Sequence, residues 1–152
     1  LYEVPYNDDP AARQAWKGYR KQLNSLLAQG RNGDAVGLFM MFVGMPADQV
    51  EGMRGRPMWP ALEAVAPTLA YDAAAMGEDA SVPIEQAARV TVPALIMDGS
   101  ASPPFMYSAA VALAGAMPHG KHLTLEGQTH DVSVEALAPV LVDFFTSNED
   151  MG

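Results

Sequence analysis

The sequence predicts an α/β fold in which an all-helical segment is followed by a β–α–β–α unit of a parallel sheet. Residues 9–76 carry apolar side chains at three- and four-residue spacing between Gly and Pro breaks, which is typical of amphipathic helices. From residue 89 onward, two short apolar runs flank an Ala-rich segment of helical length, which is typical of strands joined by a crossover helix. A loop histidine, His130, follows the second run.

The helical segment is predicted to contain five helices. The first covers residues 9–30. Asp9 can cap its start, Pro10 suits its first turn, and Gly30 suits the position just past its end. Its apolar face is formed by Trp16, Tyr19, Leu23, Leu26 and Leu27. The other four helices, bounded by Gly or Pro residues, are predicted at residues 34–43, 47–53, 60–66 and 67–76.

The β–α–β–α unit is predicted from shorter signals. It contains in order a buried strand at residues 94–98, a helix at 104–117, a strand at 122–126 and a closing helix at 133–145. Pro104 and Pro118 bound the first of these helices, and Ser133 can cap the second.

Composition excludes several classes of function. The net charge of −9, without a compensating Lys/Arg cluster, disfavours a nucleic-acid partner. No apolar run approaches the roughly 20 residues that cross a bilayer, so we predict no membrane partner. The absence of Cys removes disulfides and thiolate sites and fits a cytoplasmic protein. The three histidines lack the spacing of a ligand set, and no phosphate-binding Gly-rich loop occurs, so we predict no metal and no cofactor.

Several motifs follow one another in a fixed order along the chain. They are Leu1-Tyr2-Glu3-Val4-Pro5, Val92-Pro93-Ala94-Leu95-Ile96-Met97-Asp98-Gly99, Ala112-Leu113-Ala114 through Met117-Pro118, Gly127-Gln128-Thr129-His130, and Phe144-Phe145. This order resembles the C-terminal part of the α/β-hydrolases, in which a helical cap inserted after strand six precedes strand seven, a helix, strand eight, the catalytic His loop and a final helix. The resemblance implies a partial α/β-hydrolase fold, with the end of strand six at residues 1–8, the cap at 9–80 and the C-terminal part of the core at 81–152.

The resemblance also implies that the nucleophile (Ser, Asp or Cys) and the oxyanion hole precede Leu1. No Gly-x-Ser-x-Gly elbow occurs in the chain, and Leu1 is not an initiator Met. We therefore expect a fragment of a hydrolase that cleaves an ester, lactone or related apolar carbonyl substrate, inactive by itself. Its strand edges are expected to bind the missing N-terminal half or another copy. The alternative is a non-catalytic hydrolase-fold protein that binds a small apolar ligand or a protein partner.

His130 is the expected catalytic base, because it lies in the G-x-x-H loop that the resemblance assigns to this role. The acid is open. The family usually places it three residues after the Gly of strand seven, where Ser102 stands here and cannot carry the charge. Some members, certain haloalkane dehalogenases among them, supply the acid just after strand six, where Glu3 lies. Glu3 is preferred, Asp98 at the end of strand seven competes, and a missing acid is the third possibility.

Four apolar residues of the cap are candidate substrate-binding residues. Methionine adapts to varied apolar ligands, so these side chains could line the roof of a pocket. They are Met40, Met41, Met45 and Trp59. The alternative is that they form the core between the helices.

Overall fold

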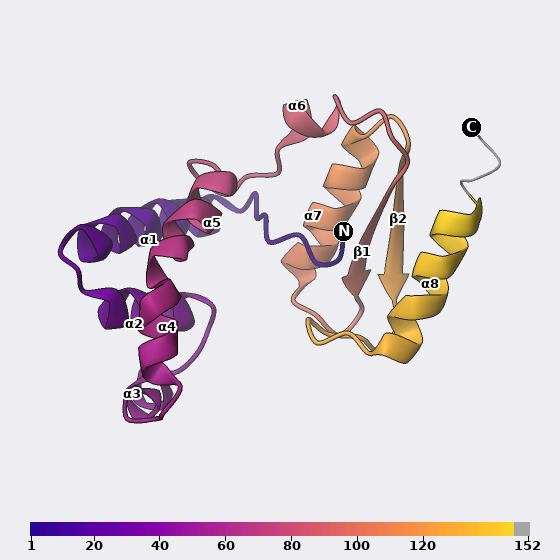
Figure 1. The fold of residues 1–152 in the computed structure, drawn as a ribbon. Helices are drawn as coiled ribbons and strands as arrows, with labels where there is room; N and C mark the ends of the chain where they lie inside the picture. The colour runs from indigo at the N-terminus through magenta and orange to yellow at the C-terminus, as the bar shows by residue number, and fades with distance from the viewer. Residues whose placement is uncertain (148–152) are drawn as a thin grey trace. The chain divides into compact units, whose positions relative to one another are not determined.

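The computed structural model describes residues 1–147 and divides them into two compact units (Figure 1). One unit joins Leu1–Asp8 to the part of the chain that begins at Ser81, and the other is Asp9–Ala80. The first unit contains the sheet and the second is helical, so the predicted α/β fold class is confirmed.

The sheet unit is built on two parallel strands, β1 (Ala94–Gly99) and β2 (Gly120–Leu125). Parallel neighbours need a crossover connection, and α7 (Pro104–Ala116) provides it. A short helix, α6 (Ile84–Ala87), precedes β1, and α8 (Val134–Ser147) closes the unit. Figure 1 shows α7 and α8 on either side of the strands.

The core of this unit lies between β1 and α7. Ile96 on β1 is fully buried, and the small side chains of Ala109 and Ala110 let α7 approach the strand closely. The buried cluster consists of Val4, Val82, Ala87, Ile96, Ala109, Ala110, Leu113 and Ala114. This packing fixes the end of β1, where polar groups gather.

The first residues of the chain pair with β1 on the side away from β2. Tyr2 forms a parallel bridge with Met97. The Met97 N–H donates to the Leu1 carbonyl at 2.8 Å, and the Glu3 N–H donates to the Met97 carbonyl at 2.8 Å. Strand β1 therefore lies between residues 1–3 and β2, which is the arrangement expected of strand seven between strands six and eight.

The helical unit packs short helices around two apolar clusters. The helices are α1 (Pro10–Ala28), α2 (Asn32–Phe42), α3 (Ala47–Arg54), α4 (Trp59–Val65), the 3₁₀ turn Ala66–Thr68 and α5 (Leu69–Ala75). Asp9 caps α1 as predicted, since its carboxylate accepts from the N–H groups of Ala11 and Ala12. Tyr19 of α1 stacks on Phe42 of α2 with ring centroids 4.4 Å apart.

The structure differs from the sequence-based elements at a few points. Helix α6 was not predicted, because four residues are too few to show a period. Phe145, the last residue of the predicted closing helix, is 65% exposed although it is a large apolar residue. Among the described residues, no helix has both the length and the hydrophobicity that crossing a membrane requires.

Candidate active site

Glu3 has an unusual backbone conformation that buries its side chain at the end of β1. Its φ is 49°, in the left-handed region that non-glycine residues rarely adopt and that costs about 1 kcal/mol or more. The hydrogen bond from its N–H to Met97 holds the backbone in place. The Glu3 side chain is fully buried, so its carboxylate needs partners within the protein.

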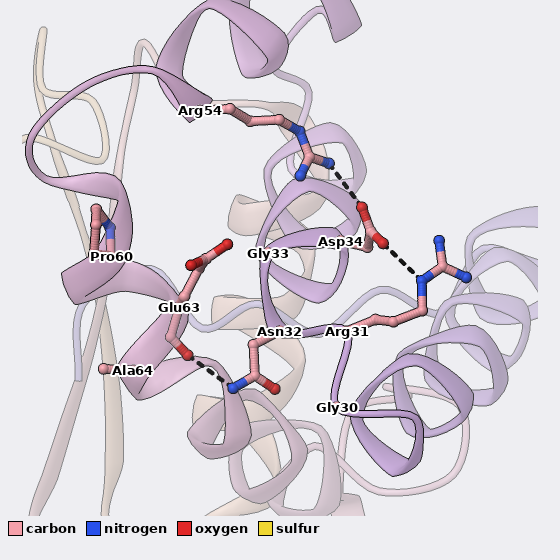
Figure 2. A pocket seen from close by; sticks show the side chains of 9 residues that line it. All are labelled: Gly30, Arg31, Asn32, Gly33, Asp34, Arg54, Pro60, Glu63 and Ala64. Atoms are coloured by element: carbon pink, nitrogen blue, oxygen red, sulfur yellow. Dashed lines mark hydrogen bonds and ion pairs between the residues drawn. The ribbon is translucent and has the colours of Figure 1, made fainter.

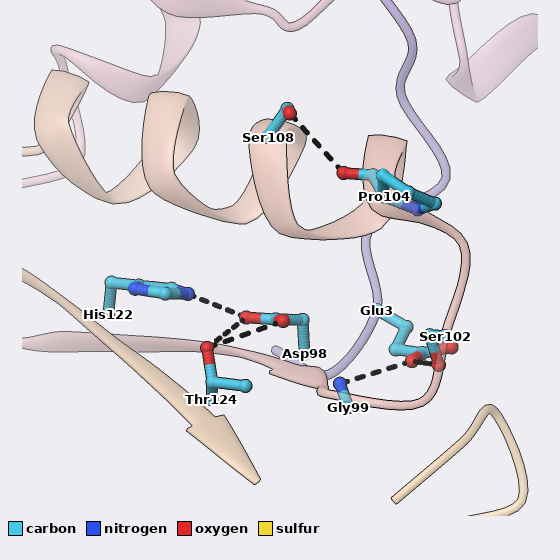
Figure 3. A network of polar contacts seen from close by, with 8 residues as sticks. All are labelled: Glu3, Asp98, Gly99, Ser102, Pro104, Ser108, His122 and Thr124. Atoms are coloured by element: carbon cyan, nitrogen blue, oxygen red, sulfur yellow. Dashed lines mark hydrogen bonds and ion pairs between the residues drawn. The ribbon is translucent and has the colours of Figure 1, made fainter. Parts of the chain in front are cut away.

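Three groups satisfy this carboxylate. Oε1 accepts from the N–H of Gly99 at 3.2 Å and from the hydroxyl of Ser102 (Figure 3). Oε2 contacts Nδ1 of His130 at 2.9 Å. The two oxygens therefore have different tasks, because one is bound to the turn after β1 and the other faces the imidazole.

Gly99 lets the histidine loop approach the end of β1. A Cβ at this position would lie 2.2 Å from the Gln128 carbonyl oxygen and 2.8 Å from the Tyr2 hydroxyl. The Gln128 carbonyl instead accepts from the N–H of Ala101 at 3.0 Å. Only glycine permits this close packing of the two loops.

The backbone directly before His130 is held by a hydrogen bond, whereas the ring of His130 is exposed. The Tyr2 hydroxyl donates to the Thr129 carbonyl at 2.5 Å, directly before the histidine. Burial raises the pKa of Tyr2, and the charges of Glu3 and Asp98 raise it further, so the phenol keeps the proton that it donates. The His130 side chain is 80% exposed. Its Nδ1 is bound to Glu3, and its other nitrogen is accessible to a reactant.

Asp98 lies close by but belongs to a different cluster. It is 1% exposed, and its Oδ1 contacts Nε2 of His122 at 2.6 Å and the hydroxyl of Thr124 at 3.1 Å (Figure 3). Tyr107 of α7 packs edge-on against the His122 ring, with centroids 5.3 Å apart. The structure thus brings Glu3, and not Asp98, to His130. The His122–Asp98 pair was not anticipated from the sequence.

The four candidate substrate-binding residues have different surroundings in the helical unit. Trp59 is 4% exposed and belongs to a core cluster with Val36, Val50 and Ala66, against which Met40 and Met45 pack. These three residues pack between the helices, and their role in substrate binding stays a prediction. Met41 is 45% exposed, and its role in substrate binding stays a prediction.

The helical unit also contains an open pocket of about 520 Å³. Figure 2 shows its lining, which consists of Gly30, Arg31, Asn32, Gly33, Asp34, Arg54, Pro60, Glu63 and Ala64. Asp34 accepts from Arg31 at 2.7 Å and from Arg54 at 3.0 Å. The hydrogen bond from Arg31 is the largest cause that holds the pKa of Asp34 below its ordinary value. None of the four candidate substrate-binding residues lines this polar, charge-paired pocket.

No metal centre is evident in the described part of the chain. Within residues 1–147, no group of three or more His, Asp and Glu side chains is arranged to hold an ion. Each of the two His–carboxylate pairs, His122 with Asp98 and His130 with Glu3, brings together one imidazole and one carboxylate. At the end of β1, the Glu3–His130 contact supports the chemistry of an oriented imidazole.

The parallel strands, the crossover helix and the loop histidine at the strand ends define the chain as part of an α/β-hydrolase fold, and the chain belongs to that fold family. It is similar to the crystal structure of an alpha/beta hydrolase from Sphaerobacter thermophilus DSM 20745, with 44% sequence identity and a TM-score of 0.72. The match covers 95% of this chain and 56% of that hydrolase. No protein-family model and no curated protein matches the chain.

Proposed function

We propose that this chain supplies the base and the acid of a nucleophile–His–acid triad, with His130 as the base and Glu3 as the acid. The enzyme would cleave an ester, a lactone or a related apolar carbonyl substrate. The observation that carries the proposal is the 2.9 Å contact between Glu3 Oε2 and His130 Nδ1. A buried carboxylate joined to an exposed imidazole is the arrangement that a catalytic base requires.

The contact explains how the imidazole could act. A carboxylate accepts hydrogen bonds and donates none, so it favours the neutral ring that carries its proton on Nδ1. Nε2 then bears the lone pair and can remove a proton from a nucleophile or from water. As the ring becomes positively charged, the buried carboxylate stabilises it.

The proposed triad needs a nucleophile that the 152 residues do not show at an elbow motif. We propose that a Ser, Asp or Cys outside this stretch provides it. The chain spans 56% of the length of the similar hydrolase. We therefore expect the 152-residue polypeptide by itself to hydrolyse no p-nitrophenyl ester, and turnover that His130→Ala abolishes would contradict this.

We propose that residues 9–80 are the helical cap of the hydrolase. This unit is compact and helical, and Met41 presents a flexible apolar side chain to its surroundings. Of the four residues considered from the sequence, Met41 is the one that we retain as a substrate contact.

The lack of a carboxylate at residue 102 favours the alternative, a non-catalytic binding protein. The hydroxyl of Ser102 donates to the carboxylate of Glu3, so an acid is present beside that position. The feature that favoured a binding protein therefore has another explanation, and catalysis is the function that we retain.

The experiment that tests the proposal uses a hydrolase in which this chain is joined to its nucleophile-bearing half. His130→Ala and Glu3→Gln should each lower kcat for short p-nitrophenyl esters by about 10³-fold or more, as expected of residues that act as a unit. Asp98→Asn is the matched control, since it also neutralises a buried carboxylate that pairs with histidine. An Asp98→Asn loss larger than that of Glu3→Gln would move the acid role to Asp98.

A further inference from the structure

We propose that Ser102 is a positioning residue that holds the carboxylate of Glu3 in line with His130. The inference rests on the proposed function, because it assumes that Glu3 orients the catalytic base. Ser102 lies in the turn after β1, where its N–H donates to the Gly99 carbonyl at 3.1 Å. Its hydroxyl donates to Glu3 Oε1, opposite the oxygen that meets His130 (Figure 3).

The two carboxylate oxygens of Glu3 cannot exchange places without breaking this contact. Oε1 is bound by Ser102 and Gly99, and Oε2 is left for the imidazole. A carboxylate at the end of a side chain otherwise rotates over a broad range of terminal torsion angles. A donor on one oxygen removes that freedom and leaves the other oxygen directed at His130 Nδ1.

Gly99 cannot perform this task equally well alone. Its N–H lies 3.2 Å from Oε1, at the long end of the normal range. Hydrogen bonds to charged groups are stronger than those between neutral groups, and a hydroxyl donor can rotate to follow the carboxylate. Ser102 therefore supplies the side-chain contact that fixes the orientation.

The chemistry also explains why a hydroxyl suits this position when the acid comes from the start of the chain. A second carboxylate at residue 102 would meet that of Glu3, and two such charges in contact cannot both remain ionised without cost. An aliphatic side chain would leave Oε1 with one donor in a buried place. Serine is small, uncharged and a donor.

The test is a double-mutant cycle in the hydrolase that contains this chain and its nucleophile, with short p-nitrophenyl esters. Ser102→Ala should lower kcat about ten-fold with little change in KM, and Ser102→Thr, which keeps the hydroxyl, should recover most of that loss. In the Glu3→Gln background, Ser102→Ala should cause no further loss. Ser108→Ala on α7 is the control, because its hydroxyl donates to the Pro104 carbonyl of its own helix.

The outcomes separate this inference from the proposed function. If Glu3→Gln leaves kcat unchanged, the triad assignment fails. If Glu3→Gln is damaging but Ser102→Ala is harmless, or if the two losses multiply, then Ser102 does not act through Glu3 and the positioning role is overturned. Failure of Ser102→Thr to exceed Ser102→Ala would also contradict it, since the hydroxyl would then be unimportant.

Discussion

Glu3 and His130 are 127 positions apart in the chain, and their side chains meet at 2.9 Å. Two successive parallel pairings within the sheet produce this contact. Residues 1–3 pair with β1, β1 pairs with β2, and the histidine loop follows β2. Because the carboxyl ends of parallel strands lie at one edge of a sheet, the first and last of these segments deliver their polar groups to the same place.

The first prediction separates stability from catalysis at Asp98. Asp98→Asn should lower the free energy of unfolding by about 1–3 kcal/mol, because the buried carboxylate contacts both His122 and Thr124 and the amide replaces one of its acceptor oxygens with a donor. Urea unfolding of the chain at neutral pH measures this. Any remaining effect on turnover should be small once the protein is folded. A stable Asp98→Asn variant with strongly reduced kcat would contradict the assignment.

The second prediction moves the acid to the position that the family ordinarily uses. Glu3→Gly removes the carboxylate and tolerates the φ of 49° that the backbone adopts there. Adding Ser102→Asp places a carboxylate on the turn from which Ser102 now reaches Glu3 Oε1. We expect the double variant to regain about ten-fold in kcat over Glu3→Gly alone. A double variant no better than Glu3→Gly would show that residue 102 cannot reach His130.

The third prediction concerns alkaline pH and the helical unit. Burial raises the pKa of Tyr19 to about 12, and the charge of Asp72 adds to the effect. The folded pKa lies above the ordinary value of 10.0, so stability that is present below pH 10 is lost as the pH rises toward 12. Tyr19→Phe should lose less stability over this interval than the wild type. Equal slopes for the two proteins in urea unfolding would contradict the prediction.

The fourth prediction concerns association. Val134, Val142 and Phe145 of α8 are 72%, 61% and 65% exposed, and residues 1–3 offer a strand edge. Such surfaces favour pairing with another chain. We expect the 152-residue chain to form an oligomer or to bind a nucleophile-bearing half. A monodisperse monomer in light scattering, with one cooperative transition in calorimetry, would contradict this.

The fold could be predicted from the sequence because its signals are local and ordered. The apolar run at residues 94–98, the Ala-rich helix and the G-x-x-H loop each appear in the expected order, and strand β1 has the expected neighbours on both sides. The boundaries shifted by a residue or two, as at β2, which begins at Gly120. Such shifts are usual where hydrogen bonding extends past the apolar run.

The contacts of the candidate site were harder to predict, because they depend on register. Alternation puts His122 and Thr124 on one side of β2, but only the pairing of Asp98 with Thr124 shows that they share that side with Asp98. The hydrogen bond from Ser102 to Glu3 likewise joins residues 99 positions apart. The sequence analysis preferred Glu3 as the acid, but nothing in the sequence indicated that the Ser102 hydroxyl would donate to its carboxylate.

The most direct test of the central claim is the tautomer of His130, read by nitrogen NMR of the ring in this chain at a pH where the ring is neutral. We predict a proton on Nδ1 in the wild type and in Asp98→Asn. In Glu3→Gln, the side-chain carbonyl should accept the hydrogen bonds from Gly99 and Ser102. The NH₂ group then faces Nδ1 and donates to it, so the ring proton should move to Nε2. A His130 tautomer that is unchanged in Glu3→Gln, or that changes only in Asp98→Asn, would contradict the account.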